Sequence, residues 1–285
     1  MRPVYIAGTA ELPEVELDKR DEAELVNAVT ALALADAGLG RDDVGFTCSG
    51  SSDYHLGRPF SFVMALDGVG PWEPIRESHV EMDGAFALYE AYVRLQHGDV
   101  DVALVYSFGK SSVGDQDAIG TLQLDPYYQM PLGIGPAQMA ALQRQALLDA
   151  EAFPELTTGR AKGRDGAASA VLTTRPMGPR IAHFKHITDA HDIGLRGLTR
   201  CASIRRAADG MGPVEAAFLH TPFHYQGPFL ARELGLARVT ASENDVPMVT
   251  GLSNINKAAR SGVRALGHCT SGPCLQQNLL CVVEP

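Results

Sequence analysis

The segment LADAGLGRDDVGFTCSG (34–50) is matched in outline by IRRAADGMGPVEAAFLHTP (204–222), and in both a helical pattern leads through glycines into an apolar strand. A second pair, YVRLQHGDVDVALVYSFG (92–109) and INKAARSGVRALGHCTSG (255–272), repeats this pattern. Each half then ends in an apolar strand, 166–176 or 277–285. Because the similarities occur in the same order, they predict that one βαβαββ unit has been duplicated.

Hydrophobic periodicity predicts strands and helices that alternate along both halves. The predicted strands are 4–10, 44–50, 101–109, 166–175, 180–187, 214–223, 263–272 and 278–285, and the predicted helices are 24–40, 87–98, 197–212 and 251–262. This alternation is typical of an α/β protein whose mixed sheet is covered by helices. Two such units packed helix to helix give a five-layer α-β-α-β-α architecture, with an N-terminal half (1–175) and a C-terminal half (176–285).

Residues 110–165 interrupt the alternation. The stretch 111–136 is rich in Gly, Pro and Asp and has no clear period, whereas 137–150 has the pattern of a helix. Long loops in compact domains commonly form lids or binding loops. We expect this region either to cover a site, with Tyr127 and Tyr128 as its cap, or to be a surface excursion.

The composition is that of a globular protein, with 45% hydrophobic and 20% charged residues among 285. A formal net charge of −10, with no cluster of Lys and Arg, argues against nucleic acid as a partner. No apolar run approaches the roughly 20 residues of a membrane helix. The start MRPVYIAGTAELPE lacks the apolar core of a signal peptide. These features predict a cytoplasmic protein without a membrane span.

The cysteines and histidines show no metal-binding pattern. There is no CxxC pair, and the spacing of Cys269, Cys274 and Cys281 is not that of zinc ligands. His183, His186 and His191 are close in sequence, but their spacing fits neither a helical ligand pair nor one face of a strand. The sequence therefore predicts reduced thiols and no metal site.

Several segments resemble landmarks of the thiolase superfamily, in the order in which that family has them. They are the start VYIAGTAELPE (4–14), the helix GAFALYEAYVRLQHGDVDVALV (84–105) after the thiolase nucleophile, the DGAAA-like strand GRDGAASAVL (163–172), the HDCF-like segment AAFLHTPFHYQGPFLARELGL (216–236) and the C-x-G-G-like turn CTSG (269–272). The resemblance covers almost the whole chain. It implies the thiolase fold, with a shortened loop region at 110–165.

Two positions depart from the thiolase pattern. Thiolases carry their nucleophilic cysteine three residues before the glycine of G-x-x-A, and counting back from Gly84 gives Glu81. The segment ENDVPMVTGL (243–252) occupies the place of GHPxGATG and puts Asp245 near the usual histidine. Because thiolase chemistry needs a thiolate to carry the acyl group, the resemblance implies that this chain is not an ordinary thiolase.

The remaining polar residues make an acid/base set. The resemblance implies that His220 keeps the place of the HDCF histidine and that Cys269 matches the thiolase cysteine that transfers a proton. His268 precedes Cys269, and because successive strand residues point to opposite faces, only one of the two should face the site. Glu81 and Asp245 are candidate bases. For each residue the alternative is a structural role, as a packed histidine, a small buried thiol or a capping carboxylate.

Candidate substrate-binding residues lie in two further segments. Arg160 and Lys162, in RAKGR, are placed to meet the phosphates of coenzyme A, the alternative being a solvated loop. Tyr225, in HYQGP, opens a helix after HTPF and either reaches the site or packs in the core.

The resemblance also implies a function. Thiolase-like proteins that lack the nucleophile include steroid aldolases, often described as lipid-transfer proteins, which cleave the carbon–carbon bond β to a coenzyme A thioester by a retro-aldol step. They act with a partner made of an OB fold and a zinc ribbon. We therefore expect a retro-aldol lyase with coenzyme A as part of its substrate and no covalently bound cofactor. The alternatives are a non-catalytic subunit that stabilises a catalytic partner, and an acyl-CoA acyltransferase with an atypical nucleophile such as Cys269.

The family also implies an oligomer. Thiolase-fold proteins form dimers through a central strand, and VEMDG (80–84) is expected near that interface. The expectation is a homodimer or a pair of related chains.

Overall fold

The computed structural model describes residues 1–57, 59–70 and 76–285. Its strands are β1 (Tyr5–Glu11), β2 (Phe46–Gly50), β3 (Glu77–Val80), β4 (Val102–Lys110), β5 (Lys162–Gly163), β6 (Asp165–Thr173), β7 (Arg180–Thr188), β8 (Ala216–Leu219), β9 (Thr240–Ala241), β10 (Asn244–Asp245), β11 (Ala265–Ser271) and β12 (Gln277–Glu284). Its α-helices are α1 (Glu22–Ala37), α2 (Asp53–Leu56), α3 (Ser61–Val69), α4 (Gly84–His97), α5 (Gln116–Leu122), α6 (Pro136–Asp149), α7 (Ala202–Ala208), α8 (Gln226–Leu234) and α9 (Thr250–Arg260). Every strand and helix predicted from periodicity is present, although β8 and α7 are shorter than predicted.

The strands follow the order β3-β2-β4-β6-β1-β7-β12-β11-β8-β9. In this ten-stranded sheet, the strands of the N-terminal half run from β3 to β1, and those of the C-terminal half follow from β7 to β9. The halves meet between β1 and β7, at the single antiparallel pair Tyr5–Arg180. The two predicted sheets are therefore joined by hydrogen bonds into one, which folds around the helices between them.

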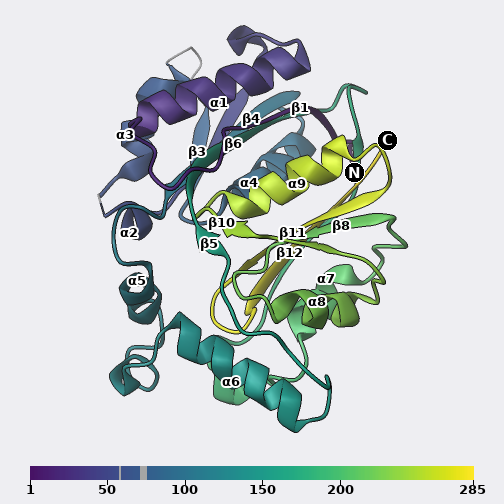
Figure 1. Ribbon diagram of the computed structural model, residues 1–285. Helices are drawn as coiled ribbons and strands as arrows, with labels where there is room; N and C mark the ends of the chain where they lie inside the picture. The colour runs from purple at the N-terminus through teal and green to yellow at the C-terminus, as the bar shows by residue number, and fades with distance from the viewer. Residues whose placement is uncertain (58, 71–75) are drawn as a thin grey trace.

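Five layers are visible in Figure 1: α1 with α3, the first sheet half, α4 with α9, the second sheet half, and α7 with α8. The largest apolar cluster lies in the middle layer, where Leu88 of α4 and Ile255 of α9 pack between Val105 of β4 and Leu279 of β12. Separate clusters lie beneath α1 and beneath α7 and α8. The predicted five-layer α/β architecture is confirmed.

Capping residues set the ends of the helices that form these layers. Asp21 begins α1 with a capping box to Glu24, and Gly38 ends it in the left-handed conformation. Asp83 is the N-cap of α4, and its side chain accepts a hydrogen bond from the backbone of Ala85. Gly98 ends α4 with φ 84°.

The region 110–165 carries α5 and α6 and projects beside the second half of the sheet in Figure 1. Ala140 and Leu147 of α6 belong to the same apolar cluster as Ile204 and Phe229 of α7 and α8. The returning chain forms β5, which pairs in parallel with β10 and brings Lys162 next to Asn244. The region is thus anchored on the C-terminal half, and a division of the chain at residue 175 remains a prediction.

Among the residues described, no helix combines the length and the apolar character needed to cross a membrane.

Candidate active site

Asp83 lies where the N-termini of α4 and α9 meet, in the middle layer. Its Oδ1 accepts hydrogen bonds from the backbone N–H groups of Ala85 at 2.8 Å and Leu252 at 3.0 Å, and its Oδ2 accepts one from Gly251 at 2.9 Å. The residue is 6% exposed. Burial raises the pKa of this carboxyl, against the opposing effects of His220 and of the three N–H groups.

Gly251 makes the close approach of these elements possible. A Cβ atom at this position would lie 2.3 Å from Sγ of Cys269 and 2.6 Å from Oδ1 of Asp83. These distances are far below van der Waals contact, so only glycine allows the start of α9 to lie against both side chains.

His220 follows β8 and faces Asp245 at the end of β10. Its Nε2 lies 3.1 Å from Oδ1 of Asp245, while the backbone N–H of Thr270 donates to its Nδ1 at 3.5 Å. A nitrogen that accepts from an N–H carries no proton, so when the ring is neutral these contacts place its hydrogen on Nε2.

The His220–Asp245 pair favours its charged form. Burial opposes the charge on the ring, but the hydrogen bond to Asp245 and the negative charges of Asp245 and Asp83 raise the pKa of His220 above its usual 6.5. Burial likewise opposes the ionised carboxyl of Asp245, yet the hydrogen bond and charge of His220 hold its pKa below the usual 3.8. The pair is suited to accept and stabilise a proton on the imidazole.

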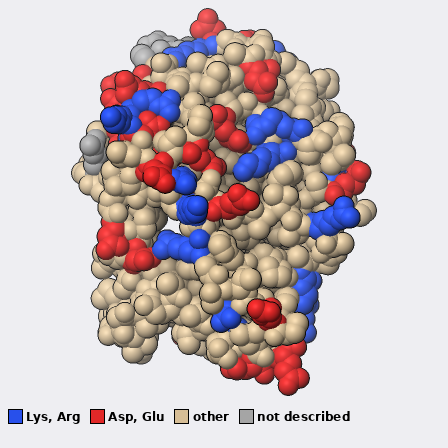
Figure 2. All heavy atoms as spheres, viewed as in Figure 1, with Lys and Arg blue, Asp and Glu red and all other residues tan. Residues whose placement is uncertain are grey.

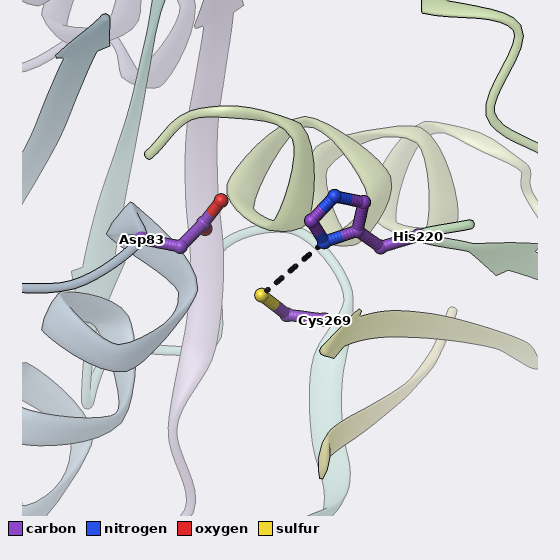
Figure 3. A group of neighbouring side chains, drawn as sticks. All are labelled: Asp83, His220 and Cys269. Atoms are coloured by element: carbon purple, nitrogen blue, oxygen red, sulfur yellow. Dashed lines mark hydrogen bonds between the residues drawn. The ribbon is translucent and has the colours of Figure 1, made fainter. Parts of the chain in front are cut away.

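Cys269, in β11, completes the cluster. Figure 3 shows the thiol, the His220 ring and the Asp83 carboxylate pointing toward one another. Sγ of Cys269 lies 3.8 Å from Nδ1 of His220, and the residue is fully buried. Burial, with the charges of Asp83 and Asp245, raises the pKa of the thiol well above 9. Cys269 is therefore a protonated thiol at neutral pH.

A cavity of about 390 Å³ opens onto this cluster. Asp83, His220, Asp245 and Thr270 line one part of its wall, and a second part is formed by Leu124, Met139, Ala140 and Cys274. Arg160 also lines it. Figure 2 shows the surface hollowed between α5 and the region of β5, with basic side chains beside the hollow. The cavity thus joins an acid/base end to an apolar wall supplied partly by region 110–165.

Two of the predicted catalytic residues lie outside the cluster. Glu81 is exposed: its Oε1 accepts from the backbone N–H of Asp53 at 2.6 Å, and its Oε2 lies 3.1 Å from Nε2 of His79. His268 is buried on the other face of β11, with Nε2 2.9 Å from Oδ1 of Asn278. Burial lowers the pKa of His268 to about 3, so the ring is uncharged. As the alternation along the strand predicts, Cys269 and His268 point to opposite sides.

Among the predicted substrate-binding residues, Arg160 is the one that lines the cavity. Its Nη1 lies 2.5 Å from Oδ1 of Asp117. Lys162 is exposed on β5 and is not part of the wall.

The three tyrosines do not line the cavity either. Tyr127 and Tyr128 are 81% and 78% exposed. Tyr225 is buried, and its hydroxyl donates to Oε1 of Gln143 at 2.7 Å, a contact that fixes α8 against α6.

Sequence reasoning missed Asp83. Counting back from Gly84 selected Glu81, but the chain between β3 and α4 turns so that Glu81 points outward and Asp83 inward. The available signal was local: an aspartate directly before Gly-Ala at the start of an apolar helix is a typical N-cap. The burial of that cap against a second helix could not be seen in the sequence.

The fold and this cluster together define a protein with the thiolase fold that holds a buried carboxylate, imidazole and thiol side by side. The chain aligns with the crystal structure of human mitochondrial 3-ketoacyl-CoA thiolase in complex with CoA at a TM-score of 0.73 and 13% identity, covering 99% of this chain and 98% of that one. It aligns with the Ltp2-ChsH2(DUF35) aldolase at a TM-score of 0.71 and 16% identity, covering 98% and 97%. The resemblance to the thiolase superfamily is confirmed at the level of the fold. No protein-family model matches the sequence, and no curated protein matches it.

Proposed function

We propose that this chain is a carbon–carbon lyase that cleaves a 3-hydroxyacyl-CoA by a retro-aldol step. The observation that carries the proposal is the position of His220, with Asp245 at Nε2 and the thiol of Cys269 at Nδ1. A retro-aldol step needs a base for a hydroxyl proton and an acid for the carbanion that follows. This arrangement provides both within one hydrogen-bonded group.

His220 is the base. Its unprotonated Nδ1 removes the proton of the substrate's 3-hydroxyl, and the C2–C3 bond breaks as the C3–O bond becomes a carbonyl. The electron pair of the broken bond passes to C2 and the thioester carbonyl as an enolate. Asp245 stabilises the imidazolium that forms, and the imidazolium in turn lies beside the developing negative charge.

Cys269 is the acid. Its thiol protonates C2 of the enolate, and the imidazolium of His220, 3.8 Å away, returns a proton to the sulfur. The products are a ketone or aldehyde and a shortened acyl-CoA, and the site regains its starting protonation. The full burial and raised pKa of Cys269 favour a proton donor over a nucleophile, which argues against the acyltransferase alternative.

Arg160 supports the assignment of a coenzyme A thioester as substrate. It lines the cavity of an acidic protein and can exchange its exposed partner Asp117 for a phosphate. The apolar wall with Leu124 and Met139 is suited to the hydrocarbon part of the acyl group, including that of a steroid or lipid side chain.

We also propose a partner protein. One neighbour of similar fold is the Ltp2-ChsH2(DUF35) aldolase, which supports a second, OB-fold and zinc-ribbon component for this chain. Strand β3 ends the order of the main sheet, and this edge is our proposed contact between two thiolase-like chains.

The test is to incubate the purified chain, alone and with such a partner, with a 3-hydroxyacyl-CoA in D2O, and to analyse the thioesters by mass spectrometry. A retro-aldol reaction yields the shortened acyl-CoA with one deuterium at C2. His220→Ala should reduce the rate by at least about 100-fold, whereas the exposed His97→Ala should not change it. Free acid and coenzyme A as the products, or no turnover in either state, would contradict the proposal.

A further inference from the structure

We propose that Asp83, His220 and Cys269 form a binding site for Zn²⁺, and that the bound ion blocks the proton transfers of the same side chains. The proposed binding site depends only on the geometry of the three side chains. Its inhibitory effect rests on the proposed retro-aldol function.

The three side chains are spaced for a common ion. One ligand atom from each lies within 4.8 Å of the other two. Tetrahedral zinc, with Zn–S near 2.3 Å and Zn–N near 2.0 Å, holds its sulfur and nitrogen ligands roughly 3.6 Å apart. Sγ of Cys269 and Nδ1 of His220 are already 3.8 Å apart. The carboxylate oxygen, which lies within 4.8 Å of the other two ligand atoms, needs a movement of up to roughly 1.5 Å to complete three corners of a tetrahedron.

Each ligand atom has a lone pair available. Nδ1 of His220 is the unprotonated nitrogen of the neutral ring, and its two contacts, with the N–H of Thr270 at 3.5 Å and Sγ of Cys269 at 3.8 Å, are both long. Oδ2 of Asp83 accepts one hydrogen bond, from Gly251, and keeps a second lone pair. Zinc binding to Cys269 expels the thiol proton, so binding releases protons.

The mixed set of ligands favours zinc over harder cations. Thiolate and imidazole ligands suit Zn²⁺ and Co²⁺, whereas Mg²⁺ and Ca²⁺ prefer oxygen alone. Asp83 within the site and Asp245 beside it are two carboxylates whose negative charge a divalent cation offsets.

Asp245 supplies the outer contact that zinc-bound histidines usually have. It accepts the Nε2–H of His220, which orients the ring and leaves Nδ1 for the ion. The fourth coordination position of the ion faces the cavity, because Asp83 and His220 both line that cavity. A water molecule, or the thiol of coenzyme A, is expected there.

A zinc ion bound at this site and acid/base catalysis by His220 and Cys269 exclude one another. An ion on Nδ1 uses the lone pair that takes the hydroxyl proton, and an ion on Sγ removes the proton that Cys269 donates. Zinc should therefore inhibit, and a chelator should restore activity.

The test is titration of the chelator-treated chain with Co²⁺, which gives a thiolate-to-cobalt absorption band when sulfur is a ligand. We expect the band at one equivalent, and its loss on addition of Zn²⁺. Cys269→Ala and His220→Gln should each abolish the band, whereas Cys48→Ala, at another buried thiol, should keep it. Asp245→Asn should weaken affinity by about 10- to 100-fold.

Two outcomes would overturn the proposal: no thiolate band with Co²⁺, or a band that persists in Cys269→Ala. Circular dichroism of each variant shows whether it is folded. The binding readout does not depend on turnover, so a chain that binds cobalt and has no lyase activity refutes the proposed function and not the site. An active chain that binds zinc without losing activity refutes the inhibitory role.

Discussion

Nε2 of His220 lies 3.1 Å from Oδ1 of Asp245, across a contact between the end of β8 and the end of β10. This hydrogen bond holds the imidazole so that its other nitrogen faces Cys269. The two nitrogens of one ring therefore differ in role, since Nε2 binds a carboxylate and Nδ1 exchanges protons.

The Asp245 carboxylate should set the pH dependence of catalysis. It raises the pKa of His220, so the unprotonated base becomes available only as pH rises above 6.5. In Asp245→Asn the pKa of His220 should fall, and the acidic limb of kcat/KM should move to lower pH while the maximal rate drops. A profile of kcat/KM against pH for both proteins checks this. If the acidic limb does not move in Asp245→Asn, the limb reports the titration of a group other than His220.

The same pair should make stability depend on pH. The raised pKa of His220 gives a contribution that is complete below pH 6.5 and is lost as pH rises through the folded-state value. The lowered pKa of Asp245 gives a second contribution to stability, which is complete above pH 3.8 and is lost as pH falls through the folded-state pKa of Asp245. Asp245→Asn should therefore lower the free energy of unfolding most between these pH values, by about 1.5–3 kcal/mol. Urea unfolding at pH 5.5 and pH 9 measures the difference, and an equal cost at both would contradict the coupling.

Gly251→Ala should lower the free energy of unfolding by about 1–3 kcal/mol, because the added methyl group would overlap Cys269 and Asp83. The matched control is Gly227→Ala. Both glycines are the second residue of a helix, but a Cβ at Gly227 meets its nearest neighbour at an ordinary 3.6 Å. The control should be neutral or more stable by up to about 1 kcal/mol, from helix propensity. Equal denaturation midpoints for the two variants would exclude the close packing at Gly251.

Arg160→Ala should weaken coenzyme A binding by roughly tenfold, the loss of one charge-assisted hydrogen bond. Lys162→Ala removes an equal charge two residues away, but this side chain is outside the cavity wall and should change affinity by less than about twofold. Calorimetry with coenzyme A distinguishes the two. Equal losses would indicate a general electrostatic effect in place of a specific contact.

Tyr225→Phe should cost about 1 kcal/mol or more of unfolding free energy, because Gln143 loses its buried partner. Tyr127→Phe, at an exposed ring, should be neutral within about 0.5 kcal/mol. Thermal unfolding of both variants makes the comparison. A neutral Tyr225→Phe would mean that the hydrogen bond is replaced by water.

The sequence alone determined the helices and strands that form the five layers, because hydrophobic periodicity and glycines at helix ends are local signals. The repeated helix–strand segments at 34–50 and 204–222 correspond to α1–β2 and α7–β8. It also indicated His220, Asp245 and Cys269, each through a motif position. It did not determine that the two sheet halves join at Tyr5 and Arg180, since backbone pairing between distant strands leaves no local pattern.

Only the tertiary structure decided which polar side chains meet. Asp83, His220, Asp245 and Cys269 come from four separate segments, and their convergence depends on α4 and α9 packing end to end at Gly251. Within the turn before α4, a difference of two positions separates the exposed Glu81 from the buried Asp83. Spacing along the chain cannot fix such a direction, because a turn's orientation follows from the packing of the elements on both sides.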